Sequence, residues 1–495
     1  MLLDIHGTLS VPFAHVRQKR KKSDPLREPL SIVRTLRHLV LTLLTVFASL
    51  PLFAGNGHII RAAKHVPNQY IVVLDPNTAP NAVASAATRL ARAHGGRIIT
   101  TYTVLFRGFC IALPDAAAAA LAHDPEVASI EEDAYGEPAT TQTVAQTYPP
   151  ACNTTPDASL ASFWHLDRLD QTSSIAPRLD GSYSYCTTGA GVRVYILDTG
   201  VLPTHPEFGG RVDPAPDLAQ YLTNAGLGLT PQCWTPEGGN DFSAVAAHGT
   251  AVASIVGGAT AGVAKGVTIV DARGLDCGGG IINQTTTSRM NKVLEWIPQD
   301  PNRHGAESVV NISWVALYTF DPPYGGNQGQ ISMAQAIANL VDGPYHIKVV
   351  CAAGNHNENV WWYIPADAPR AITVAGSYIG CDGVEAKWSY SSWGNVTAFY
   401  APAQYIQSAS TVPFVDPSRP WRSQLGDCNS YTTDTCVSGT SFSAPIVTGV
   451  VARYLQTHSG ATRDQIVSAL QANAKTYIVD PGLGNVPLIN LADCP

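Results

Sequence analysis

Charged side chains are scarce in this 495-residue chain, at 14% of all residues. They are also unevenly distributed. Residues 1–64 hold ten Lys or Arg against three Asp or Glu, which leaves 21 basic against 35 acidic side chains, a net charge of −14, in residues 65–495. Because nucleic acids bind to basic surfaces, this acidic body argues against a nucleic-acid partner.

The chain also lacks a good membrane span in its N-terminal region. The apolar run LVLTLLTVFASLPLFA at 39–54 has 16 residues, fewer than the ~20 that a spanning helix needs. It follows the basic segment RQKRKK at 17–22 and ends in small residues, which is typical of a secretory signal peptide cleaved after Ala48 or Ala54. Residues 1–54 are therefore predicted to direct secretion; the alternative is a signal anchor that retains the protein in the secretory pathway or vacuole.

Ten cysteines fit an exported protein in an oxidising compartment, where they pair. Cys110 lies in a different segment from the other nine, so one of those nine is left without a partner. Cys351 lies inside the apolar run IKVVCAAGN, where a cysteine acts as a small hydrophobic residue. We expect Cys351 to be a buried free thiol.

The chain after the leader divides into three parts. Residues 55–135 contain strand and helix patterns that predict a small α+β domain, including a strand at 69–74, helices at 81–95 and 115–128, a strand pair at 97–114 and a closing strand at 129–134. Residues 136–160 are rich in Thr, Ala and Pro and lack periodicity, which predicts a linker open to proteolysis. Residues 161–495 form the large remaining domain.

In this large domain, short apolar runs alternate with helical ones. Strands are expected at 191–198, 266–275, 308–317, 347–354, 371–376 and 397–403, and helices between them at 248–259, 286–297 and 331–342. Strands that are apolar on both faces suit a mostly parallel sheet covered by helices on both sides. Such a three-layer α/β fold places its chemistry at the carboxyl ends of the strands.

Four polar residues stand at the ends of these elements. Asp198 closes VYILD, His248 opens the helix HGTAVAS, and Asn355 follows VVCAAG. Ser441 lies where an apolar helix is expected to begin, because Pro445 is tolerated only in the first turn of a helix. Taken singly, they fit turn formers and helix caps. The DTG at Asp198 also suits a paired-aspartate protease, but the chain has no second D-T-G or D-S-G.

Together the four residues suit acyl-transfer chemistry. A serine hydroxyl needs a neighbouring base, which His248 would supply to Ser441, and Asp198 would orient the imidazole. Asn355 and the Ser441 backbone amide would bind the negative oxygen that develops when the serine attacks a carbonyl carbon. The order Asp198, His248, Ser441 is the order found in subtilisin.

The segments VYILDTGV, HGTAVASIVGG, VVCAAGNHNENV and GTSFSAPIVTG resemble the signature segments of subtilisin-like serine proteases, the peptidase S8 family. HPEFGGR, LDCGGG and FWHLDRLDQ point to the proteinase K and aqualysin-like branch, over about residues 160–490. The resemblance implies a subtilisin-like three-layer fold. The 55–135 region is similar to the I9-type inhibitory propeptide of these enzymes, which implies a zymogen that cuts itself between about 134 and 160.

The resemblance also implies further site residues. Its substrate cleft would be lined by Asn311, Ser313 and Trp314 on one side and by Gly278, Gly279 and Gly280 on the other. It implies no cofactor for catalysis and a structural calcium ion held by Asp167, Asp170, Gln171 and Asp180, because hard cations bind several oxygen ligands. It suggests a disulfide between Cys233 and Cys277. Cys428 and Cys436 flank a short loop just before Ser441, which a second disulfide would close.

The chain departs from the family pattern at one edge of the cleft. Where the family reads Ser-Leu-Gly-Gly, this chain reads Ser313-Trp-Val-Ala. We predict a secreted, monomeric serine endopeptidase that acts on proteins or peptides and is inhibited by its own propeptide. The altered edge keeps open one alternative, a fold of this family that binds peptides without turnover. An esterase is a further alternative, because it shares the same chemistry.

Overall fold

The computed structural model describes residues 57–138, 163–170, 182–229, 248–278, 281–282, 285–319, 331–380, 384–394, 396–409, 436–474 and 477–491. The predicted leader and most of the predicted linker lie outside these ranges. So do six predicted site residues: Gln171, Asp180, Cys233, Gly279, Gly280 and Cys428. Within the described ranges, no helix is both long and apolar enough to cross a membrane.

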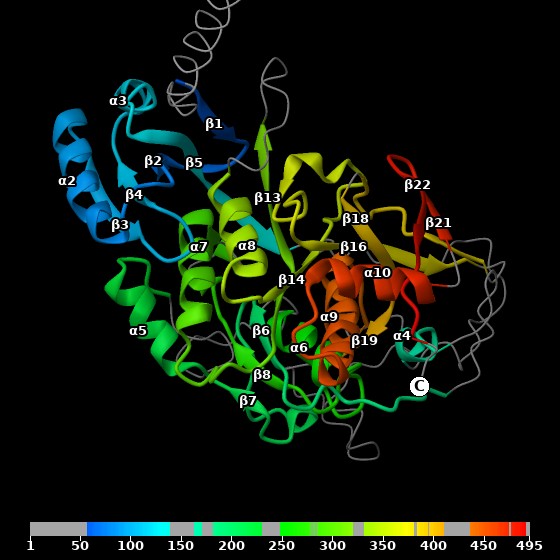
Figure 1. Ribbon diagram of the computed structural model, residues 1–495. Helices are drawn as coiled ribbons and strands as arrows, with labels where there is room; N and C mark the ends of the chain where they lie inside the picture. The colour runs from blue at the N-terminus through cyan, green and yellow to red at the C-terminus, as the bar shows by residue number, and fades with distance from the viewer. Residues whose placement is uncertain are drawn as a thin grey trace, which may run out of the picture. The chain divides into compact units, whose positions relative to one another are not determined.

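The front domain is a twisted sheet with two helices packed on it (Figure 1). Its elements are β1 (Ile59–Ala62), β2 (His65–Leu74), α2 (Val83–His94), β3 (Arg97–Tyr102), β4 (Gly108–Ala112), α3 (Asp115–Leu121) and β5 (Val127–Pro138). The strand order is β1-β5-β2-β4-β3. Alternate residues of β2, such as Val72 and Leu74, pack against Val83 and Leu90 of α2, because successive strand residues point to opposite faces.

Two sequence expectations for this domain need correction. The predicted helix 115–128 ends at Leu121, and the predicted closing strand 129–134 extends from Val127 to Pro138. The run Asp-Pro at 124–125 explains the first difference, since proline disfavours helical geometry in the residue before it. The longer strand results from pairing with strands outside the front domain.

The large domain is built on a mostly parallel sheet in the order β17-β16-β14-β12-β6-β8-β7, with β18 beside β16. The strands are β6 (Arg193–Leu197), β7 (Val212–Asp213), β8 (Thr268–Asp271), β12 (Ser308–Ile312), β14 (Lys348–Ala352), β16 (Ile372–Ile379), β17 (Glu385–Lys387) and β18 (Thr397–Pro402). Its strand pairs are parallel, except that β17 runs antiparallel to β16.

Helices cover both faces of this sheet, as the figure shows. Tyr195 and Leu197 of β6 pack in one core with α7 (Thr287–Trp296) and α8 (Ser332–Asp342). Val194 and Ile196 of the same strand pack in a second core with α6 (His248–Gly257), α9 (Thr440–Thr457) and α10 (Arg463–Asn473). The predicted three-layer subtilisin-like fold is confirmed.

The expected single strand 308–317 is interrupted at Ser313. β12 ends at Ile312, and β13 (Trp314–Thr319) leaves the parallel sheet to join the sheet of the front domain. There β13 pairs with β15 (Tyr363–Ile364) on one edge and with β1 and β5 on the other. The front domain is thus joined to the large domain by backbone hydrogen bonds.

Candidate active site

Asp198 and His248 form the best-defined pair of the site. Asp198 follows β6 and His248 opens α6, and His248 Nδ1 lies 2.7 Å from Asp198 Oδ1. Both side chains are buried. The close approach depends on Gly249, because a Cβ there would lie 2.5 Å from the Gly200 carbonyl oxygen.

Ser441 lies in the first turn of α9, next to His248: the ring of Phe442, the following residue, lies with its centroid 5.3 Å from that of the imidazole. The Ser441 hydroxyl donates to the Ser313 carbonyl at 3.1 Å. Among the described residues, His248 Nε2 has no hydrogen-bond partner. The predicted bond between His248 and Ser441 is therefore not formed in this structure, although the two residues lie on neighbouring elements. A serine side chain has three staggered positions about a single bond, and here Oγ faces Ser313.

Pro445 explains how Ser313 is held beside Ser441. The sequence places Pro445 in the first turn of the helix, but α9 begins at Thr440, so Pro445 is its sixth residue. A proline there has no N–H to donate to the Ser441 carbonyl. That carbonyl instead accepts a hydrogen bond from Ser313 Oγ at 2.8 Å.

Asn355 lies at the same end of the sheet, just after β14. Its Oδ1 accepts hydrogen bonds from Thr440 N and Thr440 Oγ1, both at 2.9 Å. Because the carbonyl side of the amide is bonded to Thr440, its NH₂ group is the end that can donate to a ligand beside Ser441. Gly354 N donates to Thr440 Oγ1 at 3.0 Å, which ties the two segments together.

The predicted cleft residues occupy different layers. Asn311 is fully buried: Nδ2 donates to Ser313 Oγ at 2.8 Å and Oδ1 accepts from Thr448 at 2.9 Å. It supports Ser313 from below. Ser313 and Trp314 lie at the edge itself, and Gly278 belongs to the short hairpin of β9 (Cys277–Gly278) and β10 (Ile281–Ile282).

The tail of the front domain lies along this edge. Glu137 and Pro138 pair antiparallel with Val315 and Trp314 of β13. Tyr135 and Gly136, just before them, pair antiparallel with β11 (Thr285–Thr286). The tail thus has strand partners on both sides.

The second wall, β11, was not anticipated from the sequence, although its two β-branched threonines before the α7 helix favour a strand. Gly136 is needed for the fit: a Cβ there would lie 2.6 Å from Trp314 Cε3.

Two buried carboxylates fix the front domain to the N-termini of two helices, and the sequence analysis missed them. Glu131 accepts hydrogen bonds from Ser332 N at 3.0 Å and from Ser332 Oγ, at the start of α8. Asp133 accepts from Ser288 N at 2.8 Å and from Ser288 Oγ at 2.6 Å, in the first turn of α7. Carboxylates at helix N-termini interact favourably with the free N–H groups and the helix dipole. The acidic run Glu131-Glu132-Asp133 inside a predicted strand was the sequence feature that could have indicated these contacts, because buried strand positions are rarely acidic.

Burial perturbs these two acids. It raises the pKa of Glu131 to about 7, against the lowering effect of the hydrogen bonds from Ser332. Burial also raises the pKa of Asp133, against the hydrogen bonds from Ser288, Gln69 and Thr287. Both acids therefore take up protons more readily in the assembled protein than in water.

The calcium prediction involves two described residues. Asp167 ends the short helix α4 (Trp164–Asp167) and is buried, and Asp170 Oδ2 accepts a hydrogen bond from Ser184 N at 2.6 Å. The other two predicted ligands lie outside the described ranges. The described part of the chain contains no group of three or more His, Cys, Asp or Glu side chains arranged to hold a metal ion.

The expected free thiol is confirmed: Cys351 is buried and unpaired, and so is Cys110. Each predicted disulfide has one cysteine outside the described ranges, and both pairings stay predictions.

Comparison with known proteins agrees with this architecture. The model of the Subtilase family matches residues 189–486, and that of Peptidase inhibitor I9 matches residues 69–137. An extracellular serine proteinase of Thermus sp. (strain Rt41A) is 31% identical over 438 residues, which cover 85% of this chain and 88% of that protein. A cuticle-degrading serine protease of Arthrobotrys oligospora is 28% identical over 417 residues, covering 81% of this chain and 83% of that protein.

Among solved structures, fervidolysin from Fervidobacterium pennivorans, a keratinolytic enzyme related to subtilisin, is similar in fold. Its TM-score is 0.57 at 18% identity, covering 90% of this chain and 64% of that one. The family match extends over more than half of the chain. The chain therefore belongs to the subtilase family of serine-type endopeptidases, with an inhibitor I9 domain ahead of the protease domain.

Proposed function

We propose that this chain is a secreted zymogen whose protease domain hydrolyses peptide bonds through an acyl-enzyme on Ser441. The observation that carries the proposal is the 2.7 Å contact between Asp198 and His248, whose imidazole ring lies against Phe442 in the first turn of α9. A buried carboxylate on Nδ1 fixes the imidazole tautomer that leaves Nε2 able to accept a proton.

In the reaction, Ser441 Oγ turns from the Ser313 carbonyl to His248 Nε2 and attacks the scissile carbonyl carbon as the imidazole takes its proton. The negative oxygen is bound by Asn355 Nδ2 and the Ser441 backbone N–H, at the positive end of α9. His248 then protonates the departing amine, and a water molecule, activated by the same imidazole, hydrolyses the acyl-enzyme.

The front domain would be the inhibitor of this site. Its tail is hydrogen-bonded to β13 and β11 as an extended peptide substrate would be. Glu131 and Asp133 anchor the same strand on α8 and α7, so removal of the tail from the cleft requires both helix N-termini to be rehydrated.

Secretion is proposed from the predicted leader and from relatives named as extracellular. Cys186 is disulfide-bonded, which supports an oxidising compartment. A monomeric enzyme without nucleic-acid partners, with structural calcium near Asp167 and Asp170, completes the proposal.

The rival function, peptide binding without turnover, is favoured by the unformed bond between His248 and Ser441. A fluorophosphonate probe distinguishes the two. We expect labelling of the processed protein, none in Ser441→Ala, and a loss of roughly four orders of magnitude in kcat in Asp198→Asn, as in other Ser-His-Asp enzymes. Wild-type protein that stays unlabelled beside a labelled control protease is a binding protein.

An esterase would label equally, so matched peptide and ester substrates complete the test. A peptidase must also protonate an amine leaving group, and it cleaves both substrates. Cleavage of the ester alone would contradict the proposed function.

A further inference from the structure

One edge of β13 is covered by two separate pieces of the front domain. Glu137 and Pro138 lie opposite Val315 and Trp314, and Arg61 and Ala62 of β1 lie opposite Thr319 and Tyr318. Between these pairs, Ala63 N donates a hydrogen bond to the Leu317 carbonyl at 3.1 Å. Both pieces run antiparallel to β13, so together they imitate one long strand.

The two pieces meet end to end. Tyr135 N donates to the Lys64 carbonyl at 2.9 Å. The opposite edge of β13 is occupied at Ala316 and Leu317 by β15, a permanent part of the protease domain. Backbone groups therefore alternate between the two edges along the strand, as in any β-sheet interior.

β1 is held to the rest of the front domain by side-chain contacts. Arg61 Nη1 lies 2.7 Å from Glu132 Oε1 and 2.6 Å from Asp115 Oδ1, and Ala62 N donates to Glu132 Oε2 at 2.8 Å. The inhibitor family match begins at residue 69, after this strand. When the front domain leaves, β1 leaves with it, and the edge of β13 from Trp314 to Thr319 loses both partners.

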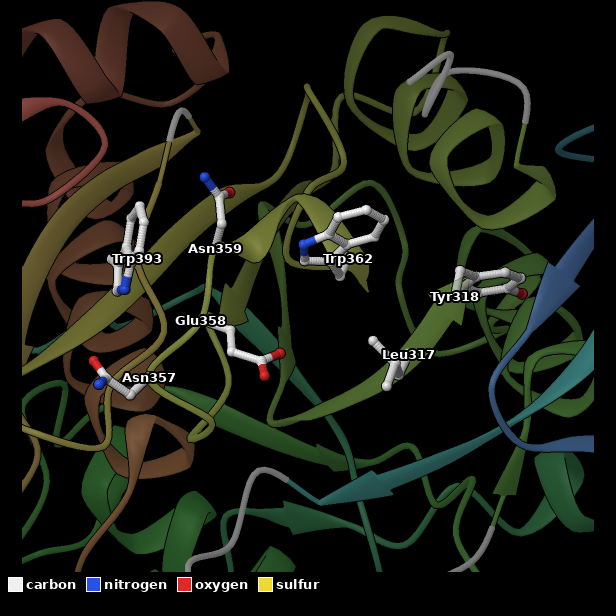
Figure 2. A pocket seen from close by; sticks show the side chains of 7 residues that line it. All are labelled: Leu317, Tyr318, Asn357, Glu358, Asn359, Trp362 and Trp393. Carbon is white, nitrogen blue, oxygen red and sulfur yellow. The ribbon is translucent and has the colours of Figure 1, made fainter. Parts of the chain in front are cut away.

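An unpaired strand edge of six residues is a template for another extended chain. On the β15 side of β13 lies a cavity of about 570 Å³, lined by Leu317, Tyr318, Asn357, Glu358, Asn359, Trp362 and Trp393. Figure 2 shows Leu317 and Trp362 facing this space from β13 and from the segment before β15. Both side chains are 37% exposed, and only the small side chain of Ala63 lies opposite Leu317.

We propose that the mature enzyme binds protein substrates along this whole edge, so that six consecutive substrate residues on the amino-terminal side of the scissile bond pair with Trp314–Thr319. A large apolar residue opposite Leu317 lies on the same face of the sheet and packs on the exposed Leu317 side chain. The inference rests on the proposed protease function, and it adds a requirement for length and a preference at one distant position.

The test uses enzyme processed from the full chain and freed of its propeptide. A short fluorogenic peptide is compared with a long one. The short peptide is long enough to pair with β13 as far as Val315. The long peptide has four more residues at its amino terminus and can pair as far as Thr319. The gain of two hydrogen-bonded pairs is expected to raise kcat/KM roughly tenfold.

Single N-methylation within the four added residues then removes one donor at a time. Because only alternate residues direct their N–H toward β13, the gain should be lost on methylation of the residue opposite Leu317 or Thr319 and kept on methylation of the residue opposite Tyr318, which is the matched control. The residue opposite Ala316 takes the place of Gly136, which pairs with β11, and it stays unmethylated. Equal kcat/KM for both peptides, or a gain that no methylation removes, overturns the inference. If neither peptide is cleaved, the protease function itself fails.

The position opposite Leu317 is tested in the protein. We expect Leu317→Ser to lower the preference for Leu over Ala at that substrate position several-fold, measured as a ratio of kcat/KM values. Leu483→Ser removes another exposed leucine, 43% exposed, from the turn between β21 (Tyr477–Asp480) and β22 (Gly484–Pro487), and should leave the ratio at the wild-type value. An equal drop in both variants contradicts the assignment to Leu317.

Discussion

Ser313 and Ser441 are hydrogen-bonded to each other twice, each hydroxyl donating to the other residue's backbone carbonyl, at 2.8 and 3.1 Å. The first bond satisfies a carbonyl that Pro445 leaves without a helical partner. The second turns the proposed nucleophile toward the strand that binds the propeptide. The break between β12 and β13 and the start of α9 therefore stabilise each other.

Ser313→Ala should destabilise the protein by about 2 kcal/mol, because it leaves the Ser441 carbonyl and the Asn311 amide buried without their partner. Thermal unfolding in a Ser441→Ala background, which prevents self-digestion, measures this. Thr223→Ala, which removes an exposed hydroxyl bonded to Ala219 within its own helix, is the control and should change stability by less than about 0.5 kcal/mol. Equal effects of both substitutions would contradict the structural role of Ser313.

Retention of the propeptide should depend on pH. The pKa of Glu131 is raised by burial from its ordinary 4.5 to about 7, and that of Asp133 is raised as well. An acid whose pKa is higher in the complex than in the free propeptide stabilises the complex. This stabilisation is complete at pH values below the ordinary pKa, and it is lost as the pH rises through the raised pKa. Propeptide affinity should therefore fall, by roughly a hundredfold for Glu131, between about pH 4.5 and pH 7.

The lag before activity appears after processing measures this release. It should be long at pH 5 and short at pH 8 in the wild type, and Glu131→Gln should make it less sensitive to pH, with the remainder due to Asp133. An unchanged pH profile in Glu131→Gln would show that Glu131 is not the group that titrates.

Gly136→Ala should weaken inhibition by the propeptide, because the added methyl group would overlap the Trp314 ring. Faster release of the propeptide at constant pH is the expected result. In a Trp314→Ala background the ring is gone, and the same substitution should have little further effect. A full effect in both backgrounds would mean that Gly136 is required for its backbone conformation instead.

The register of the propeptide tail locates the processing site. Pro138 lies opposite Trp314. The hydroxyl of Ser441, the proposed nucleophile, is hydrogen-bonded to Ser313, the residue just before Trp314. At about 3.4 Å per strand residue, Ser441 reaches a peptide bond within about four residues after Pro138. Mass spectrometry of the mature N-terminus should find a start between about 139 and 143, and a start beyond 150 would contradict this register or reveal later trimming.

Much of the fold could be read from local patterns. Buried strands such as β6, β12 and β14 have apolar residues on both faces, and helices such as α8 have one apolar stripe, so each element was recognisable from its own residues. The failures lie where a distant segment decides the local structure. Ser313 interrupts the single strand expected at 308–317 because it is hydrogen-bonded to Ser441, and β5 extends to Pro138 because β13 and β11 offer partners.

The candidate site divides in the same way. Sequence order and element ends placed Asp198, His248, Asn355 and Ser441 at one edge of the sheet, since parallel strands bring their carboxyl ends together. No local pattern predicts that the Ser441 hydroxyl is hydrogen-bonded to Ser313 or that Asn311 lies below the cleft. The acidic run EED marks Glu131 and Asp133 as unusual, but it does not identify the helix N-termini that bind them. These relationships depend on how the front domain and the helices pack.

The sequence by itself determined the kind of protein: the elements, the two domains and the residue types for acyl transfer follow from periodicity and from short motifs. Only the tertiary structure decided which groups are in contact. It set the direction of the Ser441 hydroxyl, the partners of the buried acids Glu131 and Asp133, and the pairing of β1 and the end of β5 with one edge of β13. Hydrogen bonds and burial join residues hundreds of positions apart, and their geometry is set when the chain packs.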